Sequence, residues 1–131
     1  MQPNDSPSSD EGPRRPTMLS GFLDRWRADD RVGMASFLIT DATLLVDGGG
    51  HLPVPTHEVQ GAARVAAALA DVSETTGATL LEERRINGSP GVVLRDGDDV
   101  VAVALFSFAN SRIVRAWVVA NPSKLGHWNR R

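Results

Sequence analysis

Residues 79–120 decide the fold of this chain, and they read TLLEERRINGSPGVVLRDGDDVVAVALFSFANSRIVRAWVVA. Apolar and β-branched residues occur in short runs, which are separated by the dipeptides Asn-Gly, Asp-Gly and Asn-Ser. Such dipeptides favour the tight turns that join antiparallel strands. The stretch therefore predicts a meander of strands over residues 79–86, 91–95, 99–108 and 113–120.

The part of the chain before this meander predicts mainly helices. Apolar residues at helical spacing indicate an amphipathic helix over residues 19–28. A short helix over 32–38, a buried strand over 42–46, an irregular segment over 51–60 and an alanine-rich helix over 61–70 should follow. Helices first and an antiparallel meander afterwards is an α+β pattern. We expect a cone-shaped, curved antiparallel sheet with about three helices packed on its concave face, around a central pocket.

A run of three glycines follows the predicted strand over residues 42–46. It lies in the segment Asp47-Gly48-Gly49-Gly50-His51. Glycine loses more backbone entropy on folding than any other residue, so three in succession indicate a sharp turn or a close approach by another group. The run is followed by neither a helix start nor a Lys-Ser/Thr pair, so it does not predict a phosphate-binding loop.

Composition limits the possible classes of function. The chain has 131 residues, is 41% hydrophobic and carries a net charge of −2, which fits one domain with a real core. Because basic residues do not gather in one stretch, we expect no direct binding to nucleic acid. The chain has no cysteine, and its three histidines lack metal-ligand spacing, so we expect neither a metal nor another cofactor.

Residues 1–17 are rich in proline, serine and aspartate and have almost nothing to bury, which predicts a disordered tail. A single domain should then occupy residues 18–131. The start of the sequence lacks a basic region followed by an apolar one, and no apolar run is long enough to span a membrane. We therefore expect a cytoplasmic protein that does not bind membranes.

Several motifs in the chain resemble those of one protein family. They are DGGGH at residues 47–51, NGSPG at 87–91, RDG at 95–97, RIVRAW at 112–117 and NPSKL at 121–125. Together they are similar to the SnoaL-like domain at the C-terminus of sigma-J-like extracytoplasmic-function sigma factors. The resemblance covers about residues 19–128 and implies a cone-shaped α+β barrel of the nuclear-transport-factor-2-like superfamily.

The resemblance also implies several functional expectations. In the sigma factors this domain is thought to regulate the DNA- and polymerase-binding domains, and the glycine motif and the NPSKL motif lie near that contact. Related domains elsewhere are polyketide cyclases and isomerases, and homodimers through the outer face of the sheet are common. The chain lacks the sigma factor's helical domains before residue 18, so we expect a stand-alone module.

Two residues depart from the family pattern. His51 stands where the family has a lysine, and Ser123 stands where it has an aspartate. A permanent cation is thereby replaced by a group that titrates near neutral pH. A charged contact inherited from the family would be either lost or sensitive to pH.

Asp47 and His51 are candidates for an acid–base pair, because they lie four positions apart across the glycine run. The alternative is that Asp47 caps the glycine turn and His51 is exposed. If they are not catalytic, both belong with the glycines to a binding loop. Asn121 and Lys124 of the NPSKL motif would complete that contact surface.

Trp26 and Trp117 are candidates to line the central pocket, although ordinary core packing explains them equally well. Arg115 shares a strand face with Trp117, because side chains alternate along a strand. If both point into the cone, an anionic ligand becomes plausible. If Arg115 is solvated, Trp117 lies on the outer face of the sheet, where it could form a dimer contact. The alternation alone leaves both arrangements open.

The sequence thus favours a non-catalytic SnoaL-like module that binds a small ligand or a protein partner. By resemblance, the partner would be a sigma factor or another transcription protein, and a homodimer is expected. The competing interpretation is a small cofactor-free enzyme of the cyclase or isomerase type, with Asp47 or His51 as its base.

Overall fold

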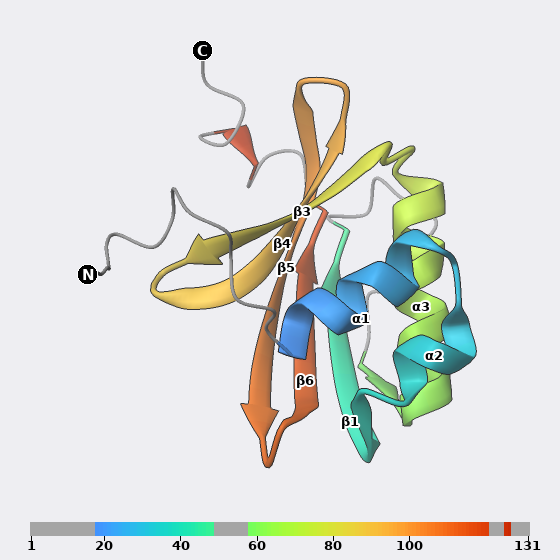
Figure 1. The fold of residues 1–131 in the computed structure, drawn as a ribbon. Coiled ribbons are helices and arrows are strands. Elements are labelled where there is room, and N and C mark those ends of the chain that lie inside the picture. The colour runs from blue at the N-terminus through green and yellow to red at the C-terminus, as the bar shows by residue number, and fades with distance from the viewer. Residues whose placement is uncertain (1–17, 49–57, 121–124, 127–131) are drawn as a thin grey trace, which may run out of the picture.

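A computed structural model of the chain describes residues 18–48, 58–120 and 125–126. In these ranges three helices and six strands follow one another in the order α1-α2-β1-β2-α3-β3-β4-β5-β6. The helices cover one face of a single curved sheet, which confirms the predicted α+β class (Figure 1). The predicted disorder of residues 1–17 lies outside the described residues.

The helices are α1 (Met18–Arg27), α2 (Arg31–Ala35) and α3 (Ala62–Thr75). Four apolar side chains of α1 are at most 3% exposed, as the helical spacing predicted; they are Leu19, Phe22, Leu23 and Trp26. Helix α2 is shorter than predicted, because the carbonyl oxygen of Phe37 already accepts a hydrogen bond of 2.8 Å from the Ile113 amide in the sheet. Helix α3 is longer than predicted and runs five residues past Ala70.

The strands are β1 (Leu38–Asp47), β2 (Val59–Gln60), β3 (Leu80–Ile86), β4 (Ser89–Asp96), β5 (Asp99–Ala109) and β6 (Arg112–Val119). Strands β3 to β6 form the predicted antiparallel meander. The first turn holds Asn87 at φ 53° and Gly88 at φ 82°, a region of backbone conformation that glycine and asparagine tolerate best. Strand β1 is twice as long as the predicted strand, since it begins at Leu38.

The sheet order is β2-β1-β6-β5-β4-β3, and one pairing in it was not predicted. Strand β1 runs parallel to β6, so Leu45 lies beside Trp117 and Asp47 beside Val119. The first and last long strands are therefore neighbours in the middle of the sheet. The sheet remains open, with β2 at one edge and β3 at the other.

Apolar side chains are buried on both faces of the sheet. The larger cluster joins the three helices to the concave face, and it includes Phe22, Leu44, Leu69, Phe106 and Val118. A smaller cluster lies on the outer face and comprises Ile86, Val93, Val100, Val103 and Leu125. No helix in the described ranges is long and apolar enough to cross a membrane.

Candidate functional site

Two of the sequence motifs, DGGGH (47–51) and NPSKL (121–125), follow neighbouring strands of the sheet. Their starting points lie at the ends of the parallel strands β1 and β6. The backbone amide of Ala120 donates a hydrogen bond of 2.8 Å to the carbonyl oxygen of Asp47. Asp47 is half-buried, while Gly48 and Ala120 are buried. The glycine segment and the NPSKL segment therefore leave the sheet from adjacent points.

Several predicted binding residues of these segments lie outside the described part of the chain. They are Gly49, Gly50, His51, Asn121 and Lys124. The proposed acid–base pairing of Asp47 with His51 consequently stays a prediction. The described ranges hold no group of three acidic or histidine side chains that could bind a metal ion.

Leu125, the last residue of the NPSKL motif, lies on the outer face of the sheet. It is only 4% exposed and belongs to the cluster of Val93 and Val103. Leu125 therefore covers β4 and β5 from outside. Burial of this leucine stabilises the fold by about 1.5–3 kcal/mol and fixes where the segment ends.

The outer face also carries an exposed apolar row beside this cluster. Trp117 of β6 is 48% exposed, and its partner across the parallel pair, Leu45, is 42% exposed. Leu105 of β5 lies on the other side of Trp117 and is half-buried against the Leu125 cluster. Leu45, Trp117 and Leu105 are called the outer row below. Trp117 faces away from the helices, so of the two arrangements left open for β6, the one with Trp117 on the outer face is correct.

Arg115 lies on the same outer face, as the shared strand alternation requires. Its Nε donates a hydrogen bond of 3.4 Å to the hydroxyl oxygen of Thr43 on β1. On its other side Ser107 of β5 is its register partner. A polar row thus borders the outer row, and the guanidinium is not directed into the cone.

Trp26 and Trp117 do not meet, since they lie on opposite faces of the sheet. Trp26 is 3% exposed and packs edge-on against Phe22, with the ring centres 5.9 Å apart. Phe22 also packs edge-on against Phe37 and Phe106. Apolar rings of the described residues thereby pack around Phe22 between α1 and the sheet, and the expected central pocket stays a prediction.

One polar atom in this apolar interior lacks a partner. The indole Nε1 of Trp26 is buried and has no hydrogen bond within the described structure. A buried donor without a partner costs about 1–3 kcal/mol. The atom therefore indicates either a strained core position or a site that another molecule completes.

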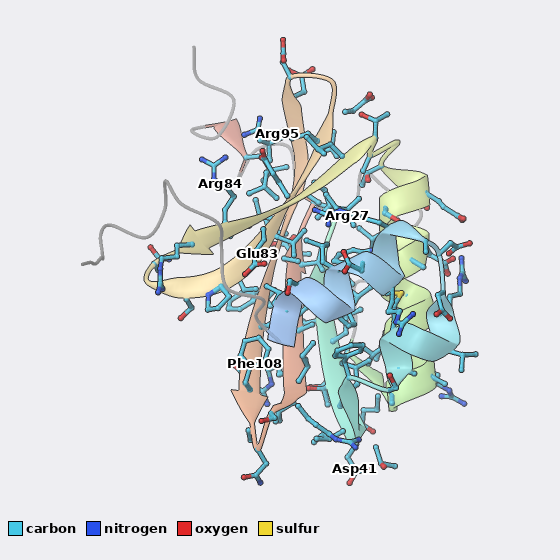
Figure 2. The ribbon with its side chains drawn as sticks, in the orientation of Figure 1. Arg27, Asp41, Glu83, Arg84, Arg95 and Phe108 are labelled. Atoms are coloured by element: carbon cyan, nitrogen blue, oxygen red, sulfur yellow. The ribbon has the colours of Figure 1, made fainter. Side chains whose placement is uncertain are left out.

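The charged run of β3 divides between the two faces of the sheet. Glu82 faces outward, where Nε of Arg95 lies 3.0 Å and Nη1 of Arg84 lies 3.3 Å from its Oε1. The two arginines are labelled in Figure 2. The hydrogen bond from Arg95 lowers the pKa of the Glu82 carboxyl. Glu83 is half-buried and pairs in register with the core residue Val92, so it faces the helices.

Sequence reasoning missed three residues of potential functional interest. The sequence pattern placed Leu45 in a buried strand and did not single out Leu105 or Glu83. Alternation along each strand could have grouped Leu45 with Asp47 on one face. It could not say which face the helices would cover.

Comparison with known proteins supports the fold. No family model matches the sequence, and no curated protein matches it. The extracytoplasmic function sigma factor SigJ of Mycobacterium tuberculosis is 21% identical with a TM-score of 0.57, and the match covers 80% of this chain but only 43% of SigJ. This chain therefore corresponds to less than half of the sigma factor.

Two smaller bacterial proteins match over most of their length. An uncharacterised conserved protein with a cystatin-like fold from Silicibacter pomeroyi is 20% identical, with a TM-score of 0.58 over 82% of this chain and 75% of its own. A SnoaL-like protein of unknown function from Burkholderia thailandensis is 18% identical, with a TM-score of 0.54 over 76% of this chain and 88% of its own. The open sheet of this chain, covered by helices on one face, and the likeness to these structures show that this chain has the SnoaL-like, NTF2-like fold.

Proposed function

We propose that this chain is a non-catalytic SnoaL-like module that binds a protein partner through the segments that follow β1 and β6. The observation that supports the proposal is the hydrogen bond between Ala120 and Asp47, because it places the start of both segments at one point. Loops held by a rigid scaffold are common sites of recognition. Leu125, the last residue of the second segment, is buried against the outer face of the sheet.

The partner that fits best is a sigma factor or another transcription protein in the cytoplasm. The likeness of the fold to part of SigJ supports this choice. At 21% identity the likeness concerns the fold and assigns no functional residue to this chain. The hypothesis of a protein partner also agrees with the net charge of −2, which does not favour direct contact with nucleic acid.

The outer row supports a second contact, with another copy of this chain. Tryptophan is enriched among residues that dominate binding energy, and Trp117 is half exposed with apolar neighbours on both sides. Arg115 precedes Trp117 by two positions, whereas Asp47 follows Leu45 by two positions on the parallel strand. A two-fold axis that runs along the outer row, across the strands, would therefore bring Arg115 of one copy toward Asp47 of the other.

Lys124 allows a direct test of the partner contact, because it is the only lysine in the sequence. An amine-reactive cross-linker can attach only there or at the terminal amino group. We expect cross-linking in an extract of the source organism to join Lys124 to a transcription protein, identified by mass spectrometry. Lys124→Arg keeps the charge but removes the amine, so it should abolish the product while leaving co-purification intact. A product that maps only to the terminal amino group, or a Lys124 partner outside transcription, would contradict the proposal.

Sedimentation velocity tests the contact between copies. We expect a dimer for the natural chain and a monomer for Trp117→Ser. Leu80→Ser is the matched control, because Leu80 is 45% exposed on an edge strand away from the outer row. Arg115→Glu should weaken the dimer, and Arg115→Glu with Asp47→Arg should restore it. A dimer that Trp117→Ser leaves unchanged would rule out the outer row as the interface.

The enzyme alternative is supported by one observation, the half-buried Glu83 on the concave face. A cofactor-free isomerase or cyclase needs a base beside the reacting carbon, and Glu83 would serve there in place of Asp47 or His51. The apolar filling around Phe22 speaks against it. Exchange of the α-protons of a ketone in heavy water, lost in Glu83→Gln, would establish the enzyme.

A further inference from the structure

An open cleft lies where the C-terminal ends of α1 and α3 meet the start of β3. Its volume is about 390 Å³, within the range of small-molecule sites. The lining residues are Trp26, Arg27, Asp29, Ser73, Glu74, Ala78, Thr79, Leu80 and Leu81. None of them belongs to the outer row or to the two motif segments, so the cleft is separate from the surfaces proposed above.

The charged side chains of the lining already have partners. Nε and Nη2 of Arg27 donate to the carbonyl oxygen of Leu81 at 3.2 and 2.6 Å, and Nη1 lies 3.4 Å from Asp24 (Figure 2). Arg31 pairs with Asp29 at 3.2 Å and with Glu74 at 3.7 Å. A charged ligand would therefore have to compete with existing ion pairs.

The hydroxyl groups of the lining are also engaged. Ser73 donates a hydrogen bond of 2.8 Å to the carbonyl oxygen of Ala70, and Thr79 donates one of 3.4 Å to that of Arg95. Among the lining side chains, only Trp26 has a polar atom that is buried and without a partner. The rest of the wall is apolar and comes from Ala78, Leu80 and Leu81.

We propose that this cleft binds a small neutral molecule with a ring-sized apolar body and one hydrogen-bond acceptor, which the Trp26 indole N–H recognises. The apolar body would lie against Ala78 and Leu80, and the acceptor would satisfy Nε1. A neutral carbonyl fits better than a carboxylate, because Asp29 and Glu74 line the same cleft. The space is ample, since a cavity of about 150 Å³ already accommodates benzene.

Binding requires a small movement of the lining. Nε1 is covered by neighbouring atoms, so water does not reach it in the free protein. Leu80, which lines the cleft, is 45% exposed. The free protein should therefore show slow exchange of the Trp26 indole proton, and ligand binding should shift its resonance.

Heteronuclear NMR of the full chain tests the proposal, because its three tryptophans give three indole signals. Acetophenone is the probe, α-methylstyrene replaces its carbonyl oxygen with a methylene group, and benzoate replaces its methyl group with a charged oxygen. We expect acetophenone to shift the Trp26 signal saturably and to bind about fivefold more tightly than α-methylstyrene, the gain typical of one hydrogen bond. Benzoate should bind more weakly than acetophenone.

Three variants serve as controls. Trp26→Phe assigns the signal and should remove the preference for acetophenone over α-methylstyrene. Leu80→Ala changes an exposed residue and should lower the affinity for both probes. This variant still tests the site if Trp26→Phe does not fold. Trp117→Phe should change neither. Equal affinity for acetophenone and α-methylstyrene, no saturable shift, or fast exchange that reveals a water on Nε1 would overturn the proposal.

Discussion

The amide of Ala120 lies 2.8 Å from the carbonyl oxygen of Asp47, although 72 residues of chain separate the two in sequence. The parallel pairing of β1 with β6 produces this contact. It joins two sequence motifs that share no local relationship. Changes in either segment should consequently affect one common surface.

The glycine run should matter more for binding than for stability. Replacing Gly48, Gly49 and Gly50 together with alanine restricts the backbone of the loop. We expect cross-linking of the partner through Lys124 to fall about tenfold, whereas the free energy of unfolding changes by less than about 1 kcal/mol. Cross-linking yield and urea unfolding measure the two effects. Comparable losses in both would make the loop merely structural.

His51 should make partner binding depend on pH. By the resemblance drawn from the sequence, His51 replaces a lysine, and an ordinary histidine titrates near pH 6.5. If that charge contacts an acidic group of the partner, affinity should be up to about fivefold higher at about pH 5.5 than at about pH 8. Titration calorimetry at both values measures the ratio. His51→Lys should remove the dependence, and identical affinities for the natural chain would disprove it.

The pair of Glu82 and Arg95 should stabilise the fold in a pH-dependent way. The hydrogen bond from Arg95 lowers the pKa of Glu82 below its ordinary value of 4.5. A lowered pKa means that the stabilisation is full above about pH 4.5 and is lost as pH falls through the folded-state pKa. Because the Glu82 side chain is 38% exposed, we expect Arg95→Gln to cost less than about 1 kcal/mol at neutral pH.

Urea unfolding of both proteins at neutral pH and at about pH 2.5 measures this pair. The difference between the natural chain and Arg95→Gln should shrink at the lower pH, because protonation of Glu82 weakens its contact with Arg95. Arg84→Gln is the matched control, because Arg84 contacts the same carboxylate but is 51% exposed. A difference that does not change with pH would assign the effect to packing of the Arg95 stem.

Gly91 should tolerate no side chain. A Cβ atom there would lie 2.6 Å from Cδ1 of Ile86 and 2.8 Å from the carbonyl oxygen of Ala104 on the neighbouring strand. The isoleucine can adjust, but the strand backbone cannot move without breaking the ladder. We expect Gly91→Ala to destabilise the fold by about 1–3 kcal/mol in urea unfolding. Gly126→Ala is the control, since a Cβ there meets nothing within 4 Å, and an equal loss in both would contradict the steric explanation.

Much of the fold could be read from the sequence, because local patterns carry it. The burial of α1 follows from the spacing of Leu19, Phe22, Leu23 and Trp26. The meander follows from its turn dipeptides, and the strand ends agree within about two residues. The start of β1 was missed, because Thr40 and Asp41 are exposed polar residues that hide the strand pattern.

The candidate site was harder to predict, because it depends on contacts between distant residues. Periodicity does not say which strand pairs with which, so the parallel neighbours β1 and β6 were not foreseen. Alternation placed Arg115 and Trp117 on one face, and only the position of the helices shows that this face is the outer one. The unpartnered nitrogen of Trp26 depends on packing around one atom, which no sequence pattern encodes.

The parallel pairing of β1 with β6 also sets an order of events during synthesis. The helices and β1 leave the ribosome long before β6, and β1 lies between β2 and β6 in the finished sheet. Until β6 arrives, β1 has only the two-residue β2 as a partner and exposes an unpaired apolar edge. The nascent chain is therefore most vulnerable to misassembly in this interval, and the surface at Asp47 and Ala120 is among the last parts of the molecule to form.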